Sequence, residues 1–177
     1  MLRTCVAAAK VDGSVCVFLE PIALYHARDL HEEGDGQWTA LPGGLHVPVG
    51  AARTHLAGHD LTIVTWANGL RMSLRVAKRL AERGIFARVL DLRWLAPLPG
   101  DDILREAEAT GRVLVADETR RTGGVSEGVL AALVDAGFGG TMARVTSKDS
   151  FVPLGAAANL VLLSEEEIEA AALRLVG

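Results

Sequence analysis

The second half of the chain alternates short apolar runs with amphipathic segments. The apolar runs have the length and β-branched character of buried strands, and they cover residues 61–66, 86–92, 112–118 and 141–147. The segments between these runs predict helices over residues 69–83 and 101–109 and a loop-to-helix unit over residues 123–137. A further helix is predicted after the last run, over residues 165–176. We therefore expect an α/β fold for residues 61–177, a three-layer α/β/α domain with a mostly parallel sheet of about five strands.

The ends of the predicted helices carry capping residues. Gly84 follows the first of these helices, where a left-handed C-terminal cap is expected. Asp101 or Asp102 is placed to cap the next helix at its N-terminus. Ser164 and Glu167 have the spacing of a capping box for the last helix.

The first 60 residues lack this regular pattern. Residues 1–10 resemble the last turns of a helix, and residues 14–21 (SVCVFLEP) predict a buried strand. Residues rich in Gly, His and charge follow without sustained periodicity, which is unusual inside a compact domain. We interpret residues 1–25 as the tail of a preceding domain and residues 26–60 as a linker, so the chain is expected to be part of a larger protein.

Composition and charge narrow the possible partners. The chain has 177 residues and a net charge of −4, from 18 basic and 22 acidic side chains, without the basic stripe that tracks a phosphate backbone. We therefore expect no nucleic acid as a partner. No apolar run reaches the ~18 residues of a membrane span, so no membrane partner is expected either. Cys5 and Cys16 lie in apolar stretches, which favours buried, reduced thiols in a cytoplasmic protein.

Polar residues follow three of the predicted strands, at Asp91 and Arg93, at Asp117 and Glu118, and at Lys148 and Asp149. The carboxyl ends of parallel strands form the ligand crevice of open α/β sheets. One hypothesis makes Arg93, Arg120 and Arg121 an anion clamp in front of the two glycines of TRRTGG, Gly123 and Gly124. The alternative, which we favour, is that these charges pair with one another and fix the loops.

No catalytic constellation is evident in the sequence. The histidines form no HExxH motif, and the one HxxxH pair, His55 and His59, lies in the linker rather than on a predicted helix. Residues 124–128 (GVSEG) have GxSxG spacing, but Ser126 falls inside a helix pattern and not on the sharp strand-to-helix turn of a nucleophile elbow. TGG is not a phosphate-binding loop, because it belongs to neither GxxxxGK[ST] nor GxGxxG. We predict no catalytic and no cofactor-binding residue in this chain.

Three stretches, DLTIVTW, FARVLDLRWLAPLPGDDI and ATGRVLVADETRRTGG, resemble the C-terminal domain of the β subunit of thiamine-diphosphate-dependent 2-oxoacid dehydrogenases. The matching positions are Asp91, Leu92, Arg93, Pro97, Thr110, Gly111, Arg112, Glu118, Thr122, Gly123 and Gly124. Upstream, VFLEPIALYHARDL resembles the last strand of the family's pyrimidine-binding domain, in the form found in branched-chain members. His59 and the long loop 31–44 depart from the family's usual pattern.

This resemblance implies that the chain is the C-terminal part of the decarboxylating first component of a 2-oxoacid dehydrogenase complex. That component oxidatively decarboxylates a 2-oxoacid and passes the acyl group to a lipoyl group. It implies thiamine diphosphate and Mg²⁺ in the complete enzyme, held by an α subunit or a fused N-terminal region, and potassium near Asp12. The implied partners also include a second copy of the chain and the acyltransferase's peripheral subunit-binding domain. Structural or interface roles are expected for Asp91, Arg93, Trp94, Glu118, Gly123 and Gly124.

More specific expectations concern the stretch VLDLRWLAPLP. Pro97 and Pro99 should prevent a helix and send the chain across the strand ends. Asp91 and Arg93 should pair with groups at neighbouring strand ends, Arg93 in a bidentate manner, beside a broad apolar surface offered by Trp94.

Two other hypotheses stay open. One is a different thiamine-diphosphate enzyme with the same type of domain, such as transketolase or deoxyxylulose-phosphate synthase. The other is a free-standing, non-catalytic α/β module that binds an anion or a partner through Arg93, Arg120 and Arg121.

Overall fold

The computed structural model of the chain describes residues 1–40, 43 and 46–177. Its centre is a five-stranded sheet with the order β1-β3-β2-β4-β5. The strands are β1 (Arg53–Ala57), β2 (Leu61–Thr65), β3 (Ala87–Asp91), β4 (Arg112–Arg120) and β5 (Thr141–Ser147). Only β1 is antiparallel to its neighbour, and the other pairs are parallel. The expected α/β fold with a mostly parallel sheet is confirmed.

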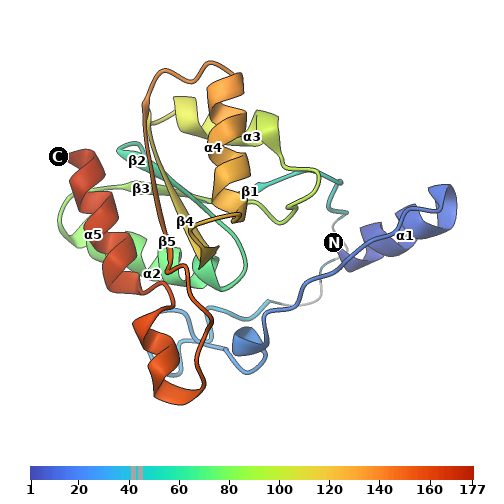
Figure 1. The fold of residues 1–177 in the computed structure, drawn as a ribbon, viewed down its shortest axis with the longest axis horizontal. Coiled ribbons are helices and arrows are strands. Elements are labelled where there is room, and N and C mark those ends of the chain that lie inside the picture. Colours follow the sequence, from blue (N-terminus) through green and yellow to red (C-terminus); the bar gives the residue numbers. More distant parts are fainter. Residues whose placement is uncertain (41–42, 44–45) are drawn as a thin grey trace.

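Helices cover both faces of this sheet (Figure 1). One face carries α2 (Asn68–Glu82) and α5 (Glu165–Val176), and the other carries α3 (Gly100–Glu108) and α4 (Val125–Asp135). Apolar residues at helical spacing on α2, such as Val76 and Leu80, are fully buried against the sheet. Burying one such side chain stabilises the fold by about 1.5–3 kcal/mol, so the two apolar layers hold the domain together.

Two of the three predicted caps are confirmed. Gly84 has a φ of 77°, and Ser164 and Glu167 form the expected capping box at the start of α5. The cap predicted for α3 is wrong, because this helix begins at Gly100, directly after Pro99, without a capping side chain. The Asp102 carboxylate instead accepts the Ala52 N–H at 2.8 Å and so ties the approach to β1 to α3.

Strand β1 lies inside the stretch that the sequence analysis assigns to the linker, so the absence of regular structure expected there is wrong for residues 53–57. It pairs with β3, and a register shift between Thr54 and Leu56 interrupts the pairing. A bulge of this kind breaks the strict alternation by which a half-exposed strand is detected in a sequence.

The N-terminal arm, residues 1–40, differs from the sheet domain. Helix α1 (Leu2–Asp12) projects away from the sheet, and a 3-10 turn follows at η1 (Ile22–Leu24) (Figure 1). The buried strand predicted over residues 14–21 is wrong: the segment has no regular secondary structure, and Val15 is 94% exposed. A strand needs a neighbour for its backbone groups, and no strand among the described residues lies beside this one.

The two cysteines also differ. Cys5 on α1 is buried as expected, whereas Cys16 is exposed, so the prediction of two buried thiols is wrong for Cys16. The cause is the same, because Cys16 belongs to the extended segment that no strand covers. Its Sγ lies 3.6 Å from the Cys5 carbonyl oxygen.

Candidate functional site

The sheet changes its winding direction between β2 and β4. Along the chain, β3 follows β2 on one side, and β4 then pairs with β2 on its other side. In open α/β sheets, the crevice beyond the carboxyl ends of two such strands is the usual ligand site. Here Asn68 and Gly69 follow β2 at the start of α2, and Glu118 lies just beyond the last β4 residue that pairs with β2, Val115.

The Glu118 side chain bridges this crevice. Its Oε1 accepts a hydrogen bond from Asn68 Nδ2 at 2.6 Å, and the Gly69 N–H also supports the carboxylate. Burial raises the pKa of the Glu118 carboxyl above its ordinary value, the charge of Asp117 adds to this, and the two hydrogen bonds oppose it. A carboxyl in this position fills the helix N-terminus where a ligand's anion would otherwise bind.

The start of α4 is filled in the same way, by the fully buried Asp117. One carboxylate oxygen of Asp117 accepts the Ser126 N–H at 2.9 Å, and the other accepts the Thr119 N–H at 2.7 Å and the Thr119 hydroxyl. Three hydrogen bonds to one buried carboxylate fix the loop between β4 and α4.

Gly123 and Gly124 make this arrangement possible. Gly123 has a φ of 70°, which a side chain would strain. A Cβ on Gly124 would lie 2.6 Å from the Arg120 carbonyl oxygen and 2.8 Å from Asp117 Oδ2. These glycines therefore have a local role in folding, and the interface role expected for them stays a prediction.

The thiamine diphosphate implied by the sequence resemblance does not fit these strand ends. A diphosphate needs free N–H donors or a bound cation, and the chain's own carboxylates engage N–H groups at the starts of α2 and α4. In the described parts of the chain, no three His, Cys, Asp or Glu side chains cluster closely enough to hold a metal ion. The strand ends thus stabilise the domain rather than offer an open cofactor site.

Asp91, Arg93 and Trp94 lie beyond β3, at the side of the sheet next to β1. The Arg93 N–H donates to Asp91 Oδ1 at 3.2 Å, and its guanidinium donates to the Ala52 carbonyl oxygen. The expected bidentate pair with a carboxylate is therefore wrong. Burial lowers the pKa of Arg93, and the Asp91 charge opposes this effect. Trp94 is only 9% exposed, so the broad apolar surface expected from it is also wrong.

The three arginines of the anion-clamp hypothesis do not come together. The charges near Arg93 are those of Asp91, Arg53 and Asp102, on the β1 side of the sheet. Arg120 instead lies near Asp149, beside β5. Asp149 itself accepts hydrogen bonds from the Thr122 N–H at 2.8 Å and the Thr122 hydroxyl at 2.6 Å, so a carboxylate already occupies this loop.

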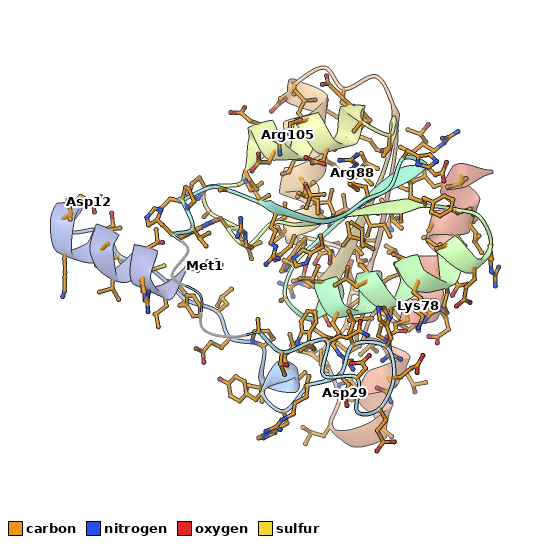
Figure 2. The ribbon with its side chains drawn as sticks, turned by 180° about the vertical axis from the view of Figure 1, so that it is seen from behind. Met1, Asp12, Asp29, Lys78, Arg88 and Arg105 are labelled. Atoms are coloured by element: carbon orange, nitrogen blue, oxygen red, sulfur yellow. The ribbon has the colours of Figure 1, made fainter. Side chains whose placement is uncertain are left out.

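Asp12 lies at the outer end of α1, far from the sheet (Figure 2). It accepts hydrogen bonds from the N–H and the hydroxyl of Ser14, and these bonds lower the pKa of Asp12. The potassium site expected near Asp12 stays a prediction.

Sequence reasoning missed Asn68, the partner of Glu118. The signal was present, since Asn68 and Gly69 follow directly on a buried strand, as ligand-crevice residues do in such sheets. It also missed a groove between β1, α2 and residues 30–40, whose lining comes from four separate segments, residues 30–40, 53–59, 74–81 and 86–87. No local pattern reveals such a convergence.

Comparisons with known proteins match this architecture. The family model for the transketolase C-terminal domain matches residues 50–168. The chain is 33% identical over 166 residues to the pyruvate dehydrogenase E1 component subunit beta-1 of Arabidopsis thaliana, covering 92% of this chain and 44% of that protein. It is 30% identical over 162 residues to the corresponding beta subunit of Bacillus subtilis, covering 89% and 47%. The chain thus spans about half the length of these relatives.

A 1-deoxy-D-xylulose-5-phosphate synthase of Gloeobacter violaceus is 36% identical over 132 residues, which cover 75% of this chain and 20% of the synthase. Among solved structures, a split-gene transketolase described as an inactive β4 tetramer matches with a TM-score of 0.69 and 26% identity, covering 77% of this chain and 44% of that one. Within residues 1–40, 43 and 46–177, every helix is too short or too polar to cross a bilayer.

Proposed function

Because the chain belongs to the transketolase C-terminal domain family, we propose that it is the C-terminal part of the decarboxylating first component of a 2-oxoacid dehydrogenase complex. The family model begins only at residue 50, whereas the similarity to the Arabidopsis beta subunit covers 92% of the chain. Most of the N-terminal arm therefore shares in that similarity, and this observation carries the proposal. The complete enzyme would decarboxylate a 2-oxoacid and transfer the acyl group to lipoyl.

The proposed substrate branch is that of branched-chain 2-oxoacids. Its support is the Phe-Leu-Glu-Pro sequence at residues 18–21 with Leu24 and Tyr25 shortly after it, which resembles branched-chain members. Thiamine diphosphate and Mg²⁺ would supply the carbanion chemistry of the complete enzyme from an α subunit or a fused N-terminal region. This chain would contribute assembly rather than catalytic groups, and potassium at Asp12 belongs to the same proposal.

Exposed apolar surface supports an assembly role. Val15, Val17 and Leu19 are between 71% and 94% exposed in the extended segment after α1. In the connection from β5 to α5, Phe151 and Leu154 are at least 95% exposed. Such residues favour burial against another protein surface. The proposed partners are the cofactor-binding region, a second copy of the chain and the peripheral subunit-binding domain, in the cytoplasm.

The exposed apolar residues after α1 also support the proposed division of the chain into three parts. Residues 1–25 would complete a preceding pyrimidine-binding domain, and residues 26–60 would connect it to the domain of residues 61–177, with β1 as the last part of the connection. Asp91, Arg93, Trp94, Glu118, Gly123 and Gly124 would act by holding the domain's surface in shape rather than by touching substrate.

Affinity purification of the tagged chain from its own cells tests this proposal. We expect it to be recovered with a thiamine-binding polypeptide, or as part of one, and the preparation to oxidise 3-methyl-2-oxobutanoate faster than pyruvate in the presence of thiamine diphosphate, Mg²⁺ and an artificial electron acceptor. The isolated chain should show no turnover. Turnover by the isolated chain, or an assembly without 2-oxoacid oxidation, would contradict the proposal.

A deoxyxylulose-phosphate synthase is the second candidate, favoured by the 36% identity to the Gloeobacter synthase. The same preparation distinguishes the two. Condensation of pyruvate with glyceraldehyde 3-phosphate, without 2-oxoacid oxidation, would select the synthase. Transfer of a two-carbon unit between sugar phosphates would select a transketolase.

A further inference from the structure

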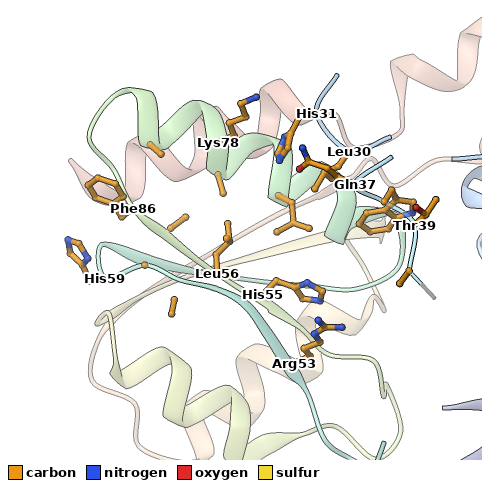
Figure 3. A pocket seen from close by; sticks show the side chains of 18 residues that line it. Leu30, His31, Gln37, Thr39, Arg53, His55, Leu56, His59, Lys78 and Phe86 are labelled. Carbon is orange, nitrogen blue, oxygen red and sulfur yellow. The ribbon is translucent and has the colours of Figure 1, made fainter. Parts of the chain in front are cut away.

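A groove of about 970 Å³ lies between β1, α2 and residues 30–40 (Figure 3). It is separate from the strand-end cluster around Glu118. Its apolar lining comes mainly from Leu56 on β1, Leu74 on α2, Leu30, Trp38 and Phe86. Ligand sites typically have volumes of ~300–1,000 Å³ and are lined by apolar and aromatic side chains with a few polar groups, so this groove has the size and composition of one.

The outer wall of the groove is held by its own hydrogen bonds. Partial desolvation raises the pKa of Asp35, but four backbone N–H groups donate to its carboxylate and together lower this pKa well below its ordinary value. Asp29 accepts the N–H groups of Gly34 and Gly36 at 2.9 and 2.8 Å. The Arg71 side chain donates to the Asp29 carbonyl oxygen and fastens this loop to α2. The loop that forms this wall of the groove is therefore held in a fixed conformation by hydrogen bonds within the chain.

The ionisable side chains that line the groove are all basic. The lining contains Arg53, Lys78 and three histidines, His31, His55 and His59, while no Asp or Glu of the described residues lines it. This is unexpected in a chain with 22 acidic and 18 basic residues. Lys78 reaches Glu32 outside the groove at 3.3 Å, but Arg53 makes no ion pair with any residue that the structure describes.

One polar atom in the groove is buried without a hydrogen bond. His55 Nε2 has no partner within hydrogen-bond distance among the described residues, and the nearest carboxylate oxygen, Asp91 Oδ2, lies 3.7 Å away. Buried polar atoms are normally satisfied, and because this nitrogen is closed off from solvent, its missing partner lies behind the lining rather than in the groove. The polar group at this end that an external acceptor can reach is the exposed Arg53 guanidinium. Arg53 and His55 lie at one end of the groove, and Phe86 and His59 lie at the other (Figure 3).

We propose that this groove binds an organic monocarboxylate with an apolar body. The carboxylate accepts hydrogen bonds from the Arg53 guanidinium, next to the His55 ring, because charge-assisted pairs with arginine are the strongest polar contacts the lining offers. The apolar body extends along Leu56 and Leu74 towards Phe86. This site goes beyond the proposed assembly function and does not depend on it.

Fluorescence of 8-anilinonaphthalene-1-sulfonate, an apolar anion, tests the site in the full chain. We expect saturable binding of the dye and its displacement by decanoate at least tenfold more effectively than by 1-decanol, which has no charge. Arg53→Ala should weaken decanoate binding about tenfold, the effect of losing one charge-assisted hydrogen bond. Equal displacement by decanoate and decanol would overturn the assignment of an anion site.

A matched pair of variants separates this groove from other exposed apolar surface. Ala81 lines the groove on the exposed side of α2, and Ala131 is exposed on α4, on the other face of the sheet. Ala81→Trp fills the groove and should abolish the decanoate-sensitive signal, while Ala131→Trp should leave it unchanged. The proposal fails if Ala81→Trp binds dye and decanoate as the unmodified chain does, because the dye then binds elsewhere, for example along residues 15–22.

Discussion

Two apolar runs of similar composition differ in burial and in secondary structure. Residues 61–65 (LTIVT) form β2, in which every residue is buried. Residues 15–19 (VCVFL) are at least as apolar, yet all five are exposed and form no strand. Strand β2 has β3 on one side and β4 on the other, whereas no described strand lies beside residues 15–19. The comparison shows that burial of an apolar run is decided by its neighbours.

The same contrast extends to polar groups. In the sheet domain, the buried carboxylate of Asp117 and the half-buried carboxylate of Glu118 have their partners within the chain. In the arm, the backbone of the segment after α1 has few partners, and its apolar side chains face outwards. The core of the sheet domain is therefore satisfied within the chain, whereas the apolar side chains after α1 stay exposed, and the proposed assembly would cover them. The following predictions test this difference.

The largest effect is expected from truncating the core of β2. Ile63→Ala should lower the free energy of unfolding by about 2–5 kcal/mol, because Ile63 is fully buried and removing its side chain leaves a cavity in the core. Val17→Ala in the arm should change it by less than about 0.5 kcal/mol. Urea unfolding followed by circular dichroism measures both. Equal losses in the two variants would show that the arm packs on the sheet domain.

The second effect concerns the loop that Asp117 holds. Gly124→Ala should destabilise the chain by about 1–3 kcal/mol, because the new methyl group would overlap the Arg120 carbonyl and the Asp117 carboxylate. Gly139→Ala is the control, since nothing lies within 4 Å of a Cβ at that position. Thermal unfolding compares them. A Gly124→Ala variant as stable as the control would contradict the tight turn described here.

A smaller effect should appear in the pH dependence. Folding raises the pKa of Glu118, so the folded chain binds more protons than the unfolded chain just above the ordinary pKa of glutamate. Ionisation of Glu118 must therefore reduce stability as the pH rises through that window. Glu118→Gln removes this loss, so the stability of the unmodified chain relative to Glu118→Gln should fall from pH 4 upwards, by chemical unfolding at each pH.

Asp12 in the arm is the control for this experiment. Hydrogen bonds from Ser14 lower its pKa, so any stability that it contributes is present at higher pH and is lost as the pH falls. Because Asp12 is exposed, Asp12→Asn should change the profile little and in the opposite direction. If instead the unmodified chain gained stability relative to Glu118→Gln as the pH rises, the account of the strand-end cluster would be contradicted.

Much of the sheet domain could be predicted from the sequence, because its elements bury one continuous face and so follow the periods of helix and strand. The exceptions have physical causes. The bulge in β1 hides its alternation, and α3 is started by the chain direction after Pro99 rather than by a capping side chain. The strand expected after α1 was wrong because an apolar run alone does not supply a pairing partner.

The site was predictable only in part. Polar residues at strand ends pointed to Asp117 and Glu118, but not to their roles, because whether a carboxylate faces a ligand or a helix N-terminus depends on distances across the sheet. The groove depended on tertiary contacts alone, since residues from 30 to 87 converge on it. The partner of Arg93 could not be predicted either, because it is the backbone carbonyl of Ala52, which no pattern of side chains in the sequence indicates.

Hydrogen exchange followed by mass spectrometry tests the central claim most directly. It would compare residues 14–24 with residues 61–65, in the isolated chain and in the assembly purified from its own cells. The account predicts fast exchange of residues 14–24 in the isolated chain and protection in the assembly, with residues 61–65 protected in both. Protection of residues 14–24 already in the isolated chain, or fast exchange in both, would contradict it.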